Sequence, residues 1–227
     1  MSARPADLAP PEGIGPLRRQ RLDFARLYLV CEPDPAGAEP EPMLRAALSG
    51  GARLIQLRDK EGRREVSRHA AFTFRRLADT YGALFIVNDD PGFALELGAD
   101  GVHIGQDDTD PGEARRVLGP DAIIGLSTHS AEQIDDAHDA GVDYISVGPI
   151  WETPTKPGRP AVGLELVRYA AANSAIPFFA IGGIDAGNAA EVAEAGATRM
   201  VVVRAIRDAD DPMLAASALR DLLDSGR

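Results

Sequence analysis

The chain has 227 residues, of which 44% are hydrophobic and 26% are charged, as is ordinary for a globular domain. Its formal net charge of −11 argues against a nucleic-acid or anionic-membrane surface, and an aromatic content of 5% argues against stacking on single-stranded nucleic acid. No apolar run reaches the roughly 18 residues that a membrane span needs. An anionic small molecule is compatible with this charge only where cations gather locally.

The first 22 residues combine Pro, Gly and Ala with mixed charge and lack the apolar segment of a secretory signal. We expect them to form a loosely ordered, flexible leader (1–22) before a single domain over residues 23–227. Cys31 is the one cysteine, so no internal disulfide can form, which suits a reducing cytoplasm. Its apolar neighbours favour a core position over a nucleophile.

Eight short apolar segments recur along the rest of the chain. They are rich in Val, Ile, Leu and Phe and mostly lack alternation, which predicts strands buried on both faces. They lie at 27–30, 53–57, 84–87, 101–104, 123–126, 144–147, 178–181 and 199–203. Segments with helical spacing separate them, and a glycine such as Gly82 ends several of these helices.

This alternation predicts an α/β fold, a single (β/α)8 TIM barrel. An open, doubly wound sheet is the alternative, but no G-x-G-x-x-G follows the first strand. In a (β/α)8 barrel the active site lies in the loops at the carboxyl ends of the strands. The residues that follow each predicted strand are therefore the candidates for function.

Cationic side chains follow the second predicted strand. Alternation places Gln56, Arg58 and Lys60 on the same side of the strand end. Two cations at this spacing could bind an anion, or the segment could be a solvated charged loop.

Acidic side chains follow the third and fourth predicted strands. Asp89 and Asp108 would meet if these strands are neighbours, and two carboxylates with diphosphate oxygens and water form a Mg²⁺ site. Asn88 and Asp90 also suit an ordinary turn, in which Asp90 caps the next helix. His103 is either a packed core residue or a hydrogen-bonding residue of a pocket, and the lack of cysteine partners argues against zinc.

The stretch GPIWETPTKPGRPAVG, residues 148–163, follows the sixth predicted strand. Its four prolines restrict a loop that carries Thr153, Thr155 and Lys156. Threonine hydroxyls can donate to a phosphate and the lysine can reach a second anion. The alternative is a proline-rich surface loop with an incidental lysine.

Two further loops carry polar or glycine residues. Ser127 follows the fifth strand and either lines a pocket or begins a helix. Gly182 and Gly183 follow the seventh strand, where they allow backbone N–H groups to approach a ligand and a following helix would offer its positive end. The alternative for these glycines is a tight turn.

Taken in chain order, eight motifs resemble the thiamine phosphate synthase family. They are LYLV, QLRDK, VNDD, GADGVHIGQDD, IIGLSTHS, GPIWETPTKPG, AIGGI and VVVRAI, and they extend from Leu27 to about Pro212. The resemblance implies a transferase of thiamine biosynthesis. It would join 4-amino-5-hydroxymethyl-2-methylpyrimidine diphosphate to 4-methyl-5-(2-phosphooxyethyl)thiazole, giving thiamine phosphate and diphosphate by a dissociative substitution.

The resemblance also implies roles for individual residues. Mg²⁺ as cofactor would be held by Asp89 and Asp108. The diphosphate would be bound by Arg58, Lys60, Asn88 and Lys156. The pyrimidine pocket would be lined by Gln56, His103 and Ser127, with Tyr28 near it, and the thiazole phosphate bound by Thr153, Thr155, Gly182 and Gly183. The catalytic residues would be Arg58, Lys60, Lys156 and Ser127.

One position departs from the family pattern. VVVRAI has Arg204 where many members resemble VVSAI, with a serine whose backbone helps to hold the phosphate. The Arg204 side chain could contact the phosphate, or it could pair with Asp208 or Asp210.

Two other functions fit parts of the pattern. A thiazole tautomerase, from a sister family with the same barrel, moves a proton and would need neither the carboxylate pair nor the cations. A non-catalytic protein could bind the thiazole phosphate on the same fold. The predicted partners are small molecules, with no nucleic acid and no membrane. The predicted location is cytoplasmic, and self-association is common among barrels of this size.

Overall fold

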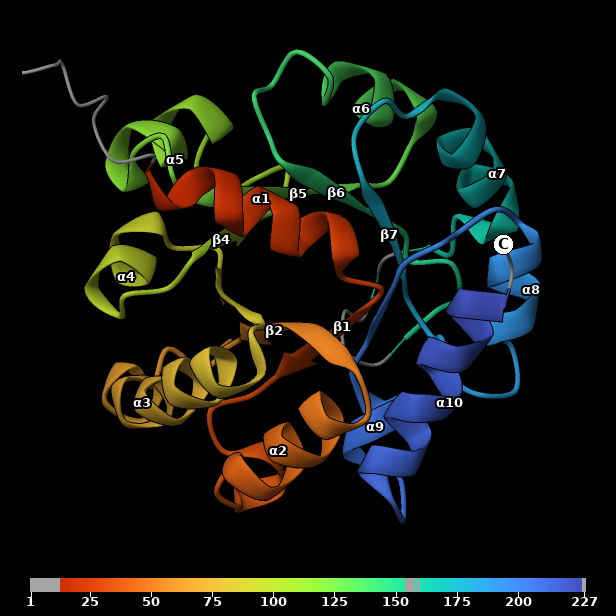
Figure 1. The fold of residues 1–227 in the computed structure, drawn as a ribbon. Helices are drawn as coiled ribbons and strands as arrows, with labels where there is room; N and C mark the ends of the chain where they lie inside the picture. Colours follow the sequence, from red (N-terminus) through yellow and green to blue (C-terminus); the bar gives the residue numbers. More distant parts are fainter. Residues whose placement is uncertain (1–12, 154–157, 159, 226–227) are drawn as a thin grey trace, which may run out of the picture.

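The computed structural model describes residues 13–153, 158 and 160–225, and its centre is a closed barrel of eight parallel strands (Figure 1). Each strand pairs with the next in chain order, and β8 pairs with β1 through Leu27 and Met200. The predicted (β/α)8 barrel is therefore confirmed, and the open doubly wound sheet is excluded. The strands are β1 Leu27–Cys31, β2 Ala52–Leu57, β3 Leu84–Asn88, β4 Gly101–Ile104, β5 Ile123–Thr128, β6 Tyr144–Val147, β7 Phe178–Ile181 and β8 Met200–Val202.

Helices surround this barrel and cover the outward faces of its strands (Figure 1). Their bounds are α1 Ile14–Phe24, α2 Glu41–Ser49, α3 Arg64–Tyr81, α4 Pro91–Glu96, α5 Pro111–Leu118, α6 Ala131–Asp136, α7 Gly163–Asn173, α8 Ala189–Glu194, α9 Arg204–Arg207 and α10 Pro212–Ser225, with a 3-10 turn η1 at Pro35–Gly37. None of the helices in the described ranges is long and apolar enough to cross a membrane.

The strands lack alternation in sequence because both of their faces are buried. Leu27 and Leu29 of β1 pack toward the helices, whereas Tyr28 and Val30 belong to a separate cluster inside the barrel. That inner cluster is apolar in its lower layer, as at Leu54. Two residues further along, the inward positions of several strands are polar. The barrel interior therefore changes from apolar to polar toward the carboxyl ends of the strands.

Local signals set where several helices begin and end. The side chains of Asp90, Asp110 and Ser130 each accept a hydrogen bond from the backbone N–H three residues later, at 2.8, 3.1 and 3.2 Å. The predicted cap at Asp90 is thereby confirmed. Gly82 ends α3 in the left-handed region with φ of 63°, which a residue without Cβ adopts at low cost.

Helix α1 lies across the barrel (Figure 1), at the end opposite the carboxyl ends of the strands. Arg18 Nε contacts Asp100 Oδ1 at 2.9 Å, and Arg19 Nε contacts Asp143 Oδ1 at 2.8 Å. Asp100 is the residue directly before β4, and Asp143 is the residue directly before β6. Leu22 of α1 is buried in the inner cluster. The prediction of a loosely ordered leader is therefore wrong from Ile14 onward, because these contacts hold the segment in place. Residues 1–12 lie outside the described residues.

Cys31 occupies the last position of β1. The residue is buried, and its thiol donates to the Glu32 carbonyl at 3.0 Å. Burial raises the pKa of this thiol well above its ordinary value. The prediction of a core cysteine rather than a nucleophile is confirmed.

Candidate active site

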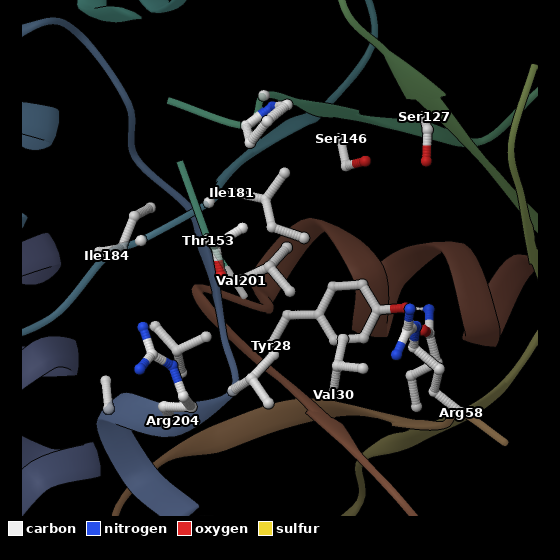
Figure 2. A pocket seen from close by; sticks show the side chains of 18 of the residues that line it. Tyr28, Val30, Arg58, Ser127, Ser146, Thr153, Ile181, Ile184, Val201 and Arg204 are labelled. Atoms are coloured by element: carbon white, nitrogen blue, oxygen red, sulfur yellow. Dashed lines mark hydrogen bonds between the residues drawn. The ribbon is translucent and has the colours of Figure 1, made fainter. Parts of the chain in front are cut away.

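A cavity of about 270 Å³ lies at the carboxyl ends of the strands (Figure 2). Its walls are inward-facing residues of the upper barrel layer and residues of the loops after β6, β7 and β8. It brings together most of the predicted site residues, namely Tyr28, Gln56, Arg58, Asn88, His103, Ser127, Thr153, Gly182, Gly183 and Arg204. Thr155 and Lys156 lie outside the described residues.

A chain of buried hydrogen bonds runs through the barrel beneath this cavity. Gln56 Nε2 donates to Tyr28 Oη at 2.5 Å, and Tyr28 Oη lies 3.1 Å from Tyr144 Oη. Tyr144 Oη lies 3.0 Å from His103 Nδ1, and His103 Nε2 lies 3.0 Å from Ser127 Oγ. We call this series the Gln56–Ser127 chain. It joins β1, β2, β4, β5 and β6, so it fixes the relative positions of side chains that are distant in sequence.

The two tyrosines of the Gln56–Ser127 chain are fully buried. Burial raises the pKa of both hydroxyls well above the ordinary value for tyrosine. The rings of Tyr28 and Tyr144 meet edge to face, with centroids 6.0 Å apart, and each contacts Phe179 in the same way. A Cβ atom at Gly125 would overlap the Tyr144 ring, so glycine at this strand position makes room for that side chain.

A group of charged side chains lies beside the cavity, at the ends of β2, β3 and β4. Lys60 Nζ contacts Asp89 Oδ2 at 2.5 Å, and the backbone N–H of Gly105 donates to Asp108 Oδ2 at 2.7 Å. Burial raises the pKa of the Asp89 carboxyl; Lys60 lowers it, and the neighbouring Asp108 raises it again. The predicted meeting of one acid from each loop is thus observed.

Arg58 connects this charged group to the cavity. It lines the cavity of about 270 Å³ and also a second, polar depression of about 390 Å³ that includes Lys60 and Glu32. Burial lowers the pKa of Arg58, while Asp89 and Glu32 raise it. Lys60, Asp89 and Asp108 are not part of the cavity wall, so the structure places them at its edge rather than inside it.

The glycines after β7 have a packing role that the sequence did not indicate. Gly182 and Gly183 have φ of 109° and 68°, which residues with a Cβ rarely adopt. A Cβ at Gly182 would lie 2.5 Å from Pro149 Cα, and one at Gly183 would lie 2.9 Å from Trp151 Cβ. Trp151 N also donates to the Gly182 carbonyl at 3.2 Å. The glycines therefore let the loop after β6 pack closely on the loop after β7.

The helix that we expected to follow these glycines begins only at Ala189. A turn intervenes, in which the Asn188 side chain donates to the Gly183 carbonyl at 2.8 Å. The donors that this loop offers to a ligand are therefore its own backbone N–H groups, rather than the end of a helix that starts at the glycines.

Arg204 lies directly after β8, at the first position of α9, and lines the cavity. Figure 2 shows it at the side of the cavity opposite Arg58. Asp208 pairs with Arg207, through Nε to Oδ1 at 2.6 Å and Nη2 to Oδ2 at 3.1 Å. Within the described ranges no ion pair at contact distance joins Arg204 to Asp208 or Asp210. Arg207 is the main cause of the lowered pKa of the Asp208 carboxyl, and the charge of Arg204 lowers it further.

Several lining residues escaped the sequence analysis. Ser146 lines the cavity and its Oγ lies 3.3 Å from His103 Nε2, while Tyr144 lies below it. Both follow from alternation along β6, which places Tyr144 and Ser146 on the inward side, so a barrel register would have revealed them. Asp185 and Pro149 also line the cavity, and no sequence signal marks their role.

A (β/α)8 barrel with cations, neighbouring carboxylates and backbone donors around one cavity is typical of enzymes that act on phosphorylated small molecules. Comparisons with known proteins specify the family. The family model described as thiamine monophosphate synthase matches residues 27–206. A thiamine-phosphate synthase of Thermus thermophilus is 52% identical over 203 residues, which are 88% of this chain and 98% of that protein.

Other relatives agree. A thiamine-phosphate synthase of Saccharopolyspora erythraea is 46% identical, over 90% of this chain and 96% of its own length. The solved structure of a thiamine phosphate pyrophosphorylase from Pyrococcus furiosus superposes with a TM-score of 0.81 at 33% identity, and the match covers 92% of this chain and 98% of that one. The chain belongs to the thiamine monophosphate synthase family. The predicted family and the predicted transferase class are confirmed.

Proposed function

We propose that the protein is a thiamine-phosphate synthase that joins 4-amino-5-hydroxymethyl-2-methylpyrimidine diphosphate to 4-methyl-5-(2-phosphooxyethyl)thiazole and releases diphosphate. The names of its relatives support thiamine biosynthesis. The observation that carries the choice of substrates is a single cavity with cations at opposite sides. Arg58 adjoins the charged group of Lys60 and Asp89, and Arg204 lies across from it (Figure 2). Two phosphorylated substrates need two such regions.

The carboxylate pair fits a magnesium ion. Asp89 and Asp108 are close enough for one to raise the pKa of the other, so a cation between them would relieve their repulsion. Among the described residues no group of three acidic, His or Cys side chains could hold a metal ion. The remaining ligands would then be diphosphate oxygens and water, as is usual for Mg²⁺ at phosphates. When bound, the ion would neutralise charge on the departing diphosphate.

The chain's own residues would contribute mainly charge and position. Arg58 and Lys60 would stabilise the negative charge that grows on the diphosphate as its bond to the pyrimidine methylene breaks. We propose that Lys156 does the same, on the family resemblance, and that Asn88 contacts this diphosphate from the cavity wall. The thiazole nitrogen attacks without losing a proton, so no general base is needed. This agrees with His103, whose two ring nitrogens are both hydrogen-bonded within the barrel.

The thiazole phosphate would lie on the side of Arg204. Thr153, Gly182 and Gly183 line the same cavity as Arg204, and in Figure 2 Thr153 lies on the side of Arg204. Arg204 would add a charged contact there, and Thr155 would add a hydroxyl. Because the contact is to one substrate, Arg204→Gln should raise KM for the thiazole phosphate about tenfold and change KM for the pyrimidine diphosphate less than twofold. Equal effects on both would contradict this assignment.

Product formation tests the proposed function. Purified protein is mixed with both substrates, with Mg²⁺ or with EDTA, and thiamine phosphate is measured by liquid chromatography. Asp89→Asn and Asp108→Asn should lose most of the Mg²⁺-dependent rate. Glu61→Gln changes an exposed acid of the same region and serves as the matched control. Binding of the thiazole phosphate without product would favour the tautomerase or the non-catalytic protein.

Because Cys31 is the one cysteine and is buried, we also propose a cytoplasmic location.

A further inference from the structure

The Gln56–Ser127 chain has a direction that its first bond sets. An amide nitrogen can only donate, so Tyr28 Oη accepts from Gln56 Nε2. The proton on Tyr28 Oη then needs its own acceptor, because the residue is buried and an unsatisfied buried hydroxyl is costly. Within the described part of the chain, Tyr144 Oη is the one remaining hydrogen-bond partner of that hydroxyl. Tyr28 therefore donates to Tyr144.

The direction continues through the histidine. Tyr144 Oη accepts from Tyr28, so its proton is directed at its other partner, His103 Nδ1. Nδ1 must then be unprotonated, and the neutral ring carries its proton on Nε2. Nε2 donates to Ser127 Oγ at 3.0 Å and more distantly to Ser146 Oγ at 3.3 Å.

The opposite direction leaves a buried proton without an acceptor. If His103 Nδ1 carried a proton, it would donate to Tyr144, and Tyr144 would donate to Tyr28. Tyr28 Oη would then accept two hydrogen bonds, and within the described residues neither of its two partners could accept the proton of Tyr28. A doubly protonated His103 has the same defect. The arrangement of donors and acceptors thus selects one tautomer.

We propose that Tyr144 is a positioning residue that fixes this direction, so that Ser127 presents a hydrogen-bond donor to the cavity and Gln56 an acceptor. Ser127 Oγ accepts from His103, which turns its proton toward the cavity that it lines. Gln56 uses Nε2 within the barrel, which leaves its amide oxygen for a ligand donor. Gly125 supports this role, because its missing side chain is what admits the Tyr144 ring.

The donor–acceptor pair selects a class of ligand, and at this step the inference rests on the proposed function. A 4-aminopyrimidine carries an amino donor beside an aromatic ring nitrogen that accepts. These groups complement the Gln56 oxygen and the Ser127 hydroxyl. A 4-oxopyrimidine places an acceptor where the amino group was, so it would face the Gln56 oxygen with like polarity.

The first test needs neither a substrate nor a variant. In the ¹⁵N-labelled protein near neutral pH, two-bond ¹H–¹⁵N correlation spectra report which ring nitrogen of each histidine carries the proton. His103→Gln identifies the His103 signals among those of the four histidines. We expect His103 to be neutral, with the proton on Nε2. A proton on Nδ1, or on both nitrogens, overturns the inference.

The second test uses Tyr144→Phe, which keeps the ring contacts with Tyr28 and Phe179 but removes the hydroxyl. We expect the two nitrogen shifts of His103 to move toward each other, because Nδ1 has lost its donor. Ser146→Ala removes only the longer contact and should leave the tautomer unchanged. An unchanged tautomer in Tyr144→Phe would show that Tyr144 does not set the direction.

The third test measures ligand choice by calorimetry with the 4-amino- and 4-oxo-5-hydroxymethyl-2-methylpyrimidines. The wild-type protein should bind the amino compound at least about tenfold more tightly, and Tyr144→Phe should lose most of this preference. Equal binding of both compounds by an enzyme that forms thiamine phosphate overturns the inference and leaves the proposed function intact. If neither compound binds and the protein forms no thiamine phosphate, the proposed function fails, and the tautomer measurement alone decides the inference.

Discussion

Replacing Asp100 with Asn tests whether helix α1 is held by a buried carboxylate. Asp100 precedes β4, and its side chain is only 5% exposed. One oxygen contacts Arg18 Nε at 2.9 Å, and the other contacts Arg75 Nη1 at 2.8 Å and accepts from Phe85 N at 2.9 Å. Asn keeps one acceptor oxygen, loses the charge and places an amide N–H toward a cation.

The expected cost is large because the contacts of Asp100 are charge-assisted and nearly dry. Hydrogen bonds to a charged group contribute about 1.5–3 kcal/mol each, and breaking one partner of a buried pair costs about 3–5 kcal/mol. Arg18 is 17% and Arg75 is 25% exposed, so both cations keep some water, which places the estimate near the lower bound. We expect the free energy of unfolding to fall by about 3 kcal/mol, and Tm by about 6–12 °C.

Guanidinium unfolding followed by circular dichroism measures this change. Asp143→Asn breaks the equivalent contacts of Arg19 and Arg115, and should cost somewhat less because Arg19 is 41% exposed. Glu165→Gln removes an exposed ion pair and should stay within about 0.5 kcal/mol of wild type. KM values should not change in any of these variants, because α1 lies at the end of the barrel opposite the cavity. A loss below about 1 kcal/mol for Asp100→Asn would refute the reasoning.

Three further predictions follow from the site and the barrel interior. Lys60→Ala should lower kcat/KM for the pyrimidine diphosphate about a hundredfold, because it removes a cation from the charged group, as steady-state kinetics would show. Gly183→Ala should destabilise the loop after β6, because φ of 68° and the Trp151 contact both oppose a Cβ; trypsin cleavage rates would reveal this. Stability should fall as pH rises above about 10, because burial raises the pKa of Tyr28 and Tyr144, and each buried tyrosine adds a slope of about 1.4 kcal/mol per pH unit.

Each of these three predictions has a matched control. Arg63→Ala changes a cation of the same loop that pairs with Asp34, and it should leave kcat/KM within a few-fold of wild type. Gly62→Ala alters another glycine with positive φ, of 71°, but nothing lies near its missing Cβ, so its effect should be the smaller one. Tyr144→Phe should reduce the alkaline slope of stability by about half of the tyrosine contribution, and an unchanged slope would contradict that assignment.

The local pattern of the sequence predicted most of what depends on neighbouring residues. The apolar runs identified the strands because parallel strands are buried on both faces, and Asp90 and Gly82 marked helix boundaries through caps that form within a few residues. The meeting of Asp89 and Asp108 was also predictable once a parallel barrel was assumed, because adjacent strands end side by side. The roles of Thr155 and Lys156 remain predictions.

Only the tertiary structure decided which distant residues meet. From Ile14 onward the predicted leader belongs to helix α1, which is held in place because Arg18 contacts Asp100, 82 residues away in the chain. Tyr144 and Ser146 entered the site through the register of β6, since alternation alone gives two faces and closure of the barrel determines which one points inward. Whether Asp208 pairs with Arg204 or Arg207 depends on how α9 turns after β8, and no local sequence pattern determines that geometry.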